Sequence, residues 1–221
     1  MTAPRLAKRI DWVCEHVKSK NVLDVGCVGD FHHMNIPNDK SLLHPRIAAC
    51  AKSVLGVDIN REGIERMRNL GYNVIYANSE NFVSERKFDV VVLGACVEHM
   101  DNPGLVLDRA WENLREKGHL IITTPNARYL GVAFKEMVGR DHRLIYTLKH
   151  LSQMLGHHGF RVVEVQFFRD EGKLNLVGKL YERVLLRFFP LLAMKFGVIA
   201  EKVESVRRGG DEAPRARRVG R

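Results

Sequence analysis

Five short apolar runs recur along the chain, separated by stretches of mixed polar and apolar sequence. Each run is rich in Val, Ile and Leu and contains few polar residues. Continuous apolar runs of this length are typical of strands in a parallel sheet that is covered on both faces. The runs predicted as strands are NVLDVGC (21–27), SVLGVDI (53–59), YNVIYAN (72–78), FDVVVLGA (88–95) and GHLIITT (118–124).

The stretches between these runs carry helix boundaries. The helix after the second strand is capped by Asn60 and stopped by Gly71. The helix after the fourth strand has Asn102 as its cap and Pro103 in its first turn, and we expect it to end at Gly118. Apolar residues at helical spacing predict three more helices, over 6–17, from about Leu42, and from Thr147.

Two further apolar runs, 160–168 and 196–204, follow the last of these helices. We expect them to form an antiparallel pair at the edge of the sheet. No internal repeat or linker interrupts the pattern, so residues 1–206 are predicted to form one domain. Alternating strands and helices predict an α/β fold with a doubly wound, mostly parallel sheet. In such sheets ligands bind beyond the carboxyl ends of the strands.

The formal charge of +9 is concentrated at one end of the chain. Residues 207–221 contain six Arg, one Asp and one Glu, a sum of +4, so the other 206 residues carry only +5. This basic tail is poor in apolar residues and contains Gly and Pro, and we expect it to be disordered. The rest of the sequence gives no sign of a basic face laced with aromatic residues, which argues against sequence-specific recognition of nucleic acid.

The four cysteines (Cys14, Cys27, Cys50 and Cys96) have no C-x-x-C spacing and lie in apolar stretches. This is typical of reduced thiols rather than of a disulfide framework or a zinc site. Charged residues interrupt the apolar positions of the N-terminal segment, so it does not read as a signal peptide. No apolar run approaches the length of a membrane span. We therefore expect a cytoplasmic protein.

The first loop, DVGCVGDFHH, is the first guide to the ligand. Its only glycines are Gly26 and Gly29, and a pyrophosphate would lack the third glycine of the dinucleotide fingerprint. S-adenosylmethionine has no phosphate, but it carries an ammonium group, a sulfonium and a ribose diol. Asp24 is a candidate to hold the ammonium end, and Gly26 allows the backbone to come close to the ligand.

The ends of the next three strands add matching groups in the order that this ligand requires. Asp58 ends the second strand and suits the ribose hydroxyls, and Ile59 can pack on the adenine. Asn78 and Ser79 follow the third strand and offer polar groups to the adenine edge. Small residues after the fourth strand, Gly94 and Ala95, leave room for the methionine part of the ligand.

The stretches VLDVGC, VLGVDI, FDVVVLGACVEHMDNP and LREKGHLIITTPN resemble class I S-adenosylmethionine-dependent methyltransferases over roughly residues 15–168. Within that superfamily the chain is most similar to small-molecule enzymes of the ubiquinone-biosynthesis and polysaccharide-cluster type. Val28 departs from the family pattern, because it stands where the family has its second glycine. The resemblance implies S-adenosyl-L-methionine as cofactor, with its binding residues at Asp24, Gly26, Cys27, Asp58, Ile59, Asn78, Ser79, Gly94 and Ala95.

Methyl transfer from a sulfonium needs no protein nucleophile, because holding the acceptor and the methyl group in line supplies up to about 7–11 kcal/mol. A hydroxyl acceptor also needs a base, worth roughly 10²–10⁴-fold in rate. His99 and His142 are the candidate catalytic bases. The alternative is that Glu98 and His99 only organise their loop and that His142 is an exposed loop residue.

Two other possibilities concern the acceptor pocket and a metal. His32 and His33 follow the cofactor turn and are further candidates to line the acceptor pocket. The His, Asp and Glu residues show no metal-ligand spacing, so no metal site is predicted.

The role of the apolar stretch 174–196 and the identity of the methyl acceptor each have more than one interpretation. Packing between the last two strands, or a contact in a homo-oligomer, is one reading of 174–196; the other is an interfacial helix that contacts a membrane, together with the basic tail. We expect a small-molecule, glycan or lipid-linked acceptor that is methylated at oxygen. The alternatives are a nicotinamide-dependent oxidoreductase and a non-catalytic binding protein with the same fold.

Overall fold

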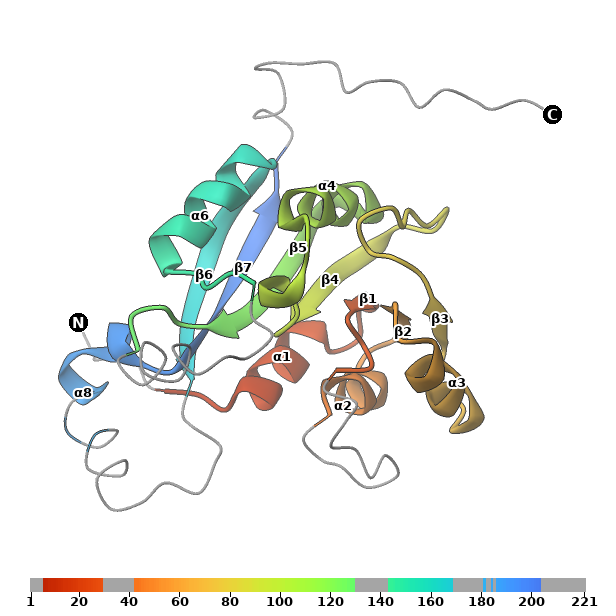
Figure 1. The fold of residues 1–221 in the computed structure, drawn as a ribbon, viewed down its shortest axis with the longest axis horizontal. Coiled ribbons are helices and arrows are strands. Elements are labelled where there is room, and N and C mark those ends of the chain that lie inside the picture. Colours follow the sequence, from red (N-terminus) through yellow and green to blue (C-terminus); the bar gives the residue numbers. More distant parts are fainter. Residues whose placement is uncertain are drawn as a thin grey trace.

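The computed structural model describes residues 6–29, 42–129, 143–168, 181, 184 and 186–203. Seven strands form one sheet in the order β3-β2-β1-β4-β5-β7-β6 (Figure 1). The strands are β1 (Asn21–Val25), β2 (Ser53–Asp58), β3 (Val74–Tyr76), β4 (Phe88–Gly94), β5 (Leu114–Pro125), β6 (Phe160–Phe168) and β7 (Lys195–Lys202).

The direction of the strands confirms the predicted topology. β1 lies between β2 and β4 and pairs with both in parallel, and β3 and β5 extend the parallel part on either side. β7 is antiparallel to both β5 and β6, as expected of a final pair at the sheet edge. The strand order reverses between β1 and β4, and in open α/β sheets ligands bind at the carboxyl ends of the strands beside this switch point.

Helices cover both faces of the sheet. The longer helices are α1 (Arg9–Val17), α2 (Leu43–Cys50), α3 (Arg61–Asn69), α4 (Pro103–Asn113) and α6 (Leu148–His157). Short turns of helix occur at η3 (Val97–His99), α8 (Leu186–Phe188) and η5 (Pro190–Leu192). None of the helices in the described part of the chain has the length and apolarity needed to cross a membrane.

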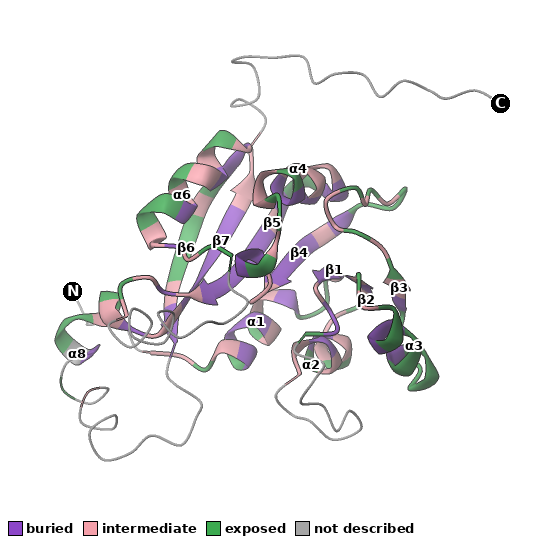
Figure 2. Ribbon diagram, viewed as in Figure 1, coloured by how far each residue is buried: buried purple, intermediate pink, exposed green. Residues whose placement is uncertain are grey.

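Alternate side chains of the central strands build a core on each face. Val22 of β1 packs with Trp12 and Val13 of α1 and with Ile47 of α2. Leu23 and its neighbours on the opposite face pack with α4 and α6 through side chains such as Val106, Leu107, Leu151 and Leu155. The central strands are therefore buried along their length, whereas β6 at the edge is exposed in its middle and buried at its ends (Figure 2). Burial on both faces explains the continuous apolar runs in the sequence.

The predicted cap at Asn60 forms, and the helix predicted to begin at Thr147 has that residue as its cap. The Asn60 side chain accepts a hydrogen bond from the backbone N–H of Gly63 at 2.9 Å, and the Thr147 side chain accepts one from His150 at 3.2 Å. Asn102 stands at the start of α4, but its side chain makes no capping bond there. Gly71 follows α3 with φ of +86°, a left-handed conformation that suits glycine and ends the helix.

The predicted boundary at Gly118 is wrong. α4 ends at Asn113, and the chain is already extended from Leu114 onwards. The Asn113 side chain donates to the carbonyls of Phe82 and Arg109, and it accepts from the N–H of Ser84 at 2.7 Å. Because Asn113 and Leu114 are both about 1% exposed, tertiary contacts override the helix-forming residues that follow.

Candidate cofactor site at the carboxyl ends of the strands

The turn after β1 forms the centre of the candidate site. Gly26 has φ of +73°, and a Cβ added to it would lie 2.8 Å from the Cβ of Cys96. The loop after β4 therefore packs directly on the bare backbone of the loop after β1. The N–H groups of Gly26 and Cys27 donate to the carbonyl of Val57 at 2.9 and 3.3 Å, which ties this turn to β2 as well.

Asp58 ends β2 beside this turn. One carboxylate oxygen accepts a hydrogen bond from the N–H of Val28 at 3.0 Å, and the other accepts from the N–H of Asn60 at 2.9 Å. Burial nevertheless raises the pKa of the Asp58 carboxyl above its ordinary value, because the backbone donors at Asn60, Val28 and Ile59 only partly offset the loss of solvent. Asp58 thus joins the two loops that border the site.

The residues predicted to contact the adenine, Ile59, Asn78 and Ser79, are exposed or partly exposed to solvent. Ile59 follows Asp58 with 67% of its surface exposed, an unusual position for a large aliphatic side chain next to a buried strand. Asn78 is exposed, and its side-chain oxygen accepts from the N–H of Glu80 at 2.9 Å. Ser79 is half-buried and borders a small hollow with Phe82.

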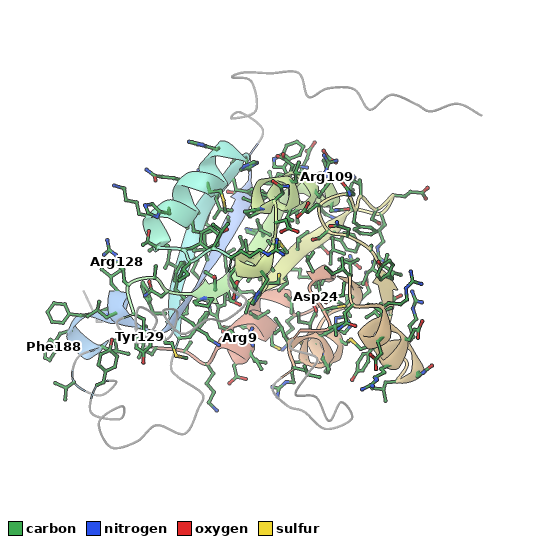
Figure 3. All side chains as sticks on the ribbon, in the orientation of Figure 1. Arg9, Asp24, Arg109, Arg128, Tyr129 and Phe188 are labelled. Carbon is green, nitrogen blue, oxygen red and sulfur yellow. The ribbon has the colours of Figure 1, made fainter. Side chains whose placement is uncertain are left out.

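Asp24 is more deeply placed than the other predicted residues. It is 2% exposed, and its carboxylate accepts a hydrogen bond from Nδ1 of His44 at 2.8 Å. Figure 3 labels Asp24 on β1, next to α2. The sequence reasoning missed His44, because a single histidine in the first turn of a predicted helix carries no recognisable pattern.

The turn after β4 completes the site. Gly94 lies under the side chain of Leu43, which occupies the space that a Cβ would need. Ala95 adopts φ of +61°, and its N–H donates to the carbonyl of Thr123 at 2.8 Å. Burial raises the pKa of the Cys27 and Cys96 thiols well above the ordinary value. All four cysteines are free, as predicted.

Glu98 and His99 occupy different environments, although they are adjacent in η3. Glu98 is 2% exposed and accepts a hydrogen bond from the Thr124 hydroxyl at 3.2 Å. Its backbone carbonyl accepts from the N–H groups of Arg143 and Leu144 at 2.9 and 3.2 Å. Glu98 therefore joins the ends of β4 and β5 to the segment that leads into α6, whereas His99 is exposed on the same side of the sheet.

Tyr146 closes this side of the site. It is 6% exposed, and its backbone forms an isolated parallel β-bridge with Asn126, which follows β5. Burial, and to a lesser extent the Glu98 carboxylate, raises the pKa of the Tyr146 hydroxyl to about 12. At physiological pH the hydroxyl keeps its proton and can only act as a neutral hydrogen-bonding group.

Several predicted residues lie outside the described part of the chain: His142, His32, His33 and the tail 207–221. Within that part, no group of three or more His, Cys, Asp or Glu side chains is arranged to hold a metal ion. Two surface hollows of about 390 and 520 Å³ are present, and neither is lined by a predicted site residue. The larger lies along α1 and β6, and the smaller lies at the amino ends of β4 and β5.

Comparison with known proteins gives both a family and a fold. A family model described as a methyltransferase domain matches residues 3–165. A ubiquinone biosynthesis O-methyltransferase of Aromatoleum aromaticum is 26% identical over 171 residues, which cover 73% of this chain and 64% of that protein. This chain thus spans less than two thirds of the length of that relative.

Solved structures of methyltransferases share the fold of this chain over most of its length. A SAM-dependent methyltransferase of Archaeoglobus fulgidus superposes with a TM-score of 0.64 at 20% identity, covering 88% of this chain and 91% of the other. The magnesium protoporphyrin IX methyltransferase of Synechocystis PCC 6803, solved with bound SAH, gives a TM-score of 0.59 at 15% identity over 87% and 81% of the two chains. At these identities the structures show the fold alone. The family model, which covers most of the chain, shows that this protein belongs to the methyltransferase domain family and confirms its resemblance to class I S-adenosylmethionine-dependent methyltransferases.

Proposed function

We propose that this protein transfers a methyl group from S-adenosylmethionine to an oxygen atom of a small-molecule, glycan or lipid-linked acceptor. The observation that carries the proposal is the grouping of three features at the ends of β1 and β2. A glycine turn leaves the backbone bare at Gly26, a half-buried carboxylate stands beside it at Asp58, and Ile59 is 67% exposed. Family membership supports this over the nicotinamide-dependent alternative.

The residues present fit the proposed cofactor in type and order. Asp58 offers carboxylate oxygens to a ribose diol, and the exposed face of Ile59 offers an apolar surface to the adenine. The Gly26 turn allows backbone groups to approach the ligand without interference from a side chain. When bound, S-adenosylmethionine supplies an electrophilic methyl group on a positively charged sulfur.

The protein's part in the reaction is to hold the acceptor in line and to receive its proton. His99 is exposed at the carboxyl end of β4, and we assign it the role of general base. When neutral, its imidazole would accept the proton that an acceptor hydroxyl loses on methylation. His142 is a second candidate for the same role.

The acceptor class draws support from the names of the relatives. Curated relatives are named ubiquinone biosynthesis O-methyltransferases, which favours transfer to oxygen. We also propose that the protein is cytoplasmic. Residues 174–196 are proposed to contact either a membrane or a second copy of the chain. Incubation with labelled S-adenosylmethionine and a panel of phenols, sugars and lipid-linked glycans would identify the acceptor by the product that carries label.

Calorimetric titration with S-adenosylmethionine tests the cofactor assignment. We expect saturable binding by the full chain, weakened at least about ten-fold by Asp58→Ala, since hydrogen bonds to a charged group contribute about 1.5–3 kcal/mol each. Asp89→Ala is the matched control. Asp89 also accepts bonds from the backbone and side chain of a neighbouring residue, Asn21, but lies at the amino end of β4.

Two outcomes would contradict the proposal. One is a folded wild-type chain that does not bind the cofactor, especially if it binds reduced nicotinamide cofactor instead. The other is an equal loss of cofactor affinity in the Asp58 and Asp89 variants, which would mean that the loss comes from a less stable fold and not from a contact with the cofactor. Tight cofactor binding without transfer to any acceptor in the panel would favour the non-catalytic alternative.

A further inference from the structure

The first turn of α2 lies unusually close to the sheet. Two strand glycines permit this approach, one on each side of β1. A Cβ on Gly56 of β2 would lie 2.8 Å from Cε1 of His44, and a Cβ on Gly94 of β4 would overlap the side chain of Leu43. Leu43 and His44, the first two residues of α2, therefore occupy the space that side chains at Gly94 and Gly56 would need.

One polar contact joins this turn to the strand between the two glycines. Nδ1 of His44 lies 2.8 Å from a carboxylate oxygen of Asp24, and the two side chains are 0% and 3% exposed. The Nε2 atom of His44 is buried and has no hydrogen-bond partner among the described residues. Because a carboxylate oxygen can only accept, Nδ1 is the donor in this hydrogen bond.

The buried pair lies beside the turn after β1 that would bind the cofactor. Asp24 precedes Gly26 by two residues on β1, and His44 is the second residue of α2. A carboxylate that is 2% exposed is poorly placed to meet the ammonium group of a ligand directly. Its burial and its partner both suit a different role, which is to hold the first turn of α2 to β1 beside the Gly26 turn.

We propose that His44 is a positioning residue of the cofactor site, which holds the first turn of α2 against the sheet through its hydrogen bond to Asp24 and so steadies the turn at residues 26–29 that follows β1. For its ligand this inference rests on the proposed function. The contact itself can be tested without any ligand. A buried hydrogen bond has strict geometry, so the shape of the substituting side chain should decide the outcome.

Three substitutions separate shape from polarity. The amide nitrogen of His44→Asn occupies a position close to Nδ1 and can still donate to Asp24. The amide of His44→Gln lies near the position of Nε2, and His44→Leu removes the donor. The control is His158→Leu, which removes another His–Asp contact, with Nδ1 of His158 3.0 Å from Asp108 near the end of α6, away from the loop.

The first measurement is the dissociation constant for S-adenosylhomocysteine, taken at a temperature at which every variant is folded. We expect His44→Leu and His44→Gln to weaken binding at least ten-fold, and His44→Asn and His158→Leu to remain within about three-fold of the wild type. Binding equal to wild type in His44→Leu, or no recovery in His44→Asn, would overturn the inference.

The second measurement is amide hydrogen exchange of the protein without ligand. The N–H groups of Gly26 and Val28 are hydrogen bonded to Val57 and Asp58 and report on the first turn of the loop. We expect their exchange to rise at least ten-fold in His44→Leu and to stay unchanged in His158→Leu. If the wild type binds no S-adenosylhomocysteine, the proposed function fails, and exchange alone decides on His44: unchanged protection in His44→Leu rejects its positioning role.

Discussion

Gly26 and Gly29 share a left-handed backbone but differ in the space around them. Gly26 has φ of +73° with Cys96 at 2.8 Å from an added Cβ, whereas Gly29 has φ of +65° and nothing within 4 Å. An alanine costs about 1–2 kcal/mol in this conformation at either position, and the contact at Gly26 adds about 1–3 kcal/mol. We expect urea denaturation to show the larger loss of stability in Gly26→Ala, together with weaker cofactor binding. Equal losses in the two variants would mean that Cys96 moves aside without cost.

His99 offers a test of the proposed base. It is exposed beside the site, and its neighbour Glu98 is buried in contacts that organise the loop. We expect His99→Gln to lower kcat for a hydroxyl acceptor by roughly 10²–10⁴-fold while cofactor binding stays unchanged, because only the proton transfer is lost. His119→Gln, at the amino end of β5, is the control. If kcat is unchanged in His99→Gln, then His142 or solvent, and not His99, acts as the general base.

At the scale of elements, patterns confined to one element were the ones that the sequence predicted well. β6 spans 160–168 as expected, and the caps at Asn60 and Thr147 form because they depend on neighbours three residues away. The end of α4 was misplaced, since Asn113 is held by contacts with residues about 30 positions earlier. His44 was missed for the same reason, because its partner Asp24 lies 20 residues away in the chain.

The elements that follow β6 expose an apolar surface formed by Val184, Phe188, Phe189 and Leu191, which are 45–70% exposed. Figure 3 shows Phe188 pointing away from the ribbon. The side chain of Asn126, just after β5, donates to the carbonyls of Leu191 and Ala193, so this surface adjoins the carboxyl end of the sheet. Exposed aliphatic and aromatic side chains are typical of segments that lie on a membrane, and a membrane contact here would bring a lipid-linked acceptor to the site.

Vesicle sedimentation tests this contact. We expect the double variant Phe188→Ser and Phe189→Ser to bind vesicles containing anionic lipid several-fold more weakly than the wild type. The control is Val163→Ser with Val165→Ser, which removes apolar groups that are also exposed, 49% and 36%, on the edge strand β6. Equal vesicle binding by the wild type and the Phe variant would reject the membrane contact. If the wild type is a dimer in solution and the Phe variant is a monomer, the surface is instead a contact between two copies.

At the scale of the whole molecule, the topology determines where the site lies. Reversal of strand order between β1 and β4 opens the sheet edge at which Gly26, Asp58 and Ala95 meet, although they are far apart in sequence. A sequence pattern can predict this edge, since parallel strands place their carboxyl ends together. It cannot predict the depth of each side chain, because burial is decided by helices that pack from elsewhere, as Asp24 beneath α2 illustrates.

The uneven charge of the chain predicts that the domain and the basic tail act independently. Deleting residues 207–221 removes +4 of the +9 formal charge but none of the described core. We therefore expect the shortened chain to keep the melting temperature and the cofactor affinity of the full protein. Its binding to anionic vesicles should weaken and lose part of its salt dependence, because each lost cation removes a screened attraction worth about 1 kcal/mol near the surface. Binding to neutral vesicles should stay the same, since it depends on apolar groups. A lower melting temperature would show instead that the tail packs on the domain, and unaltered salt dependence would place the electrostatic contact on the domain itself.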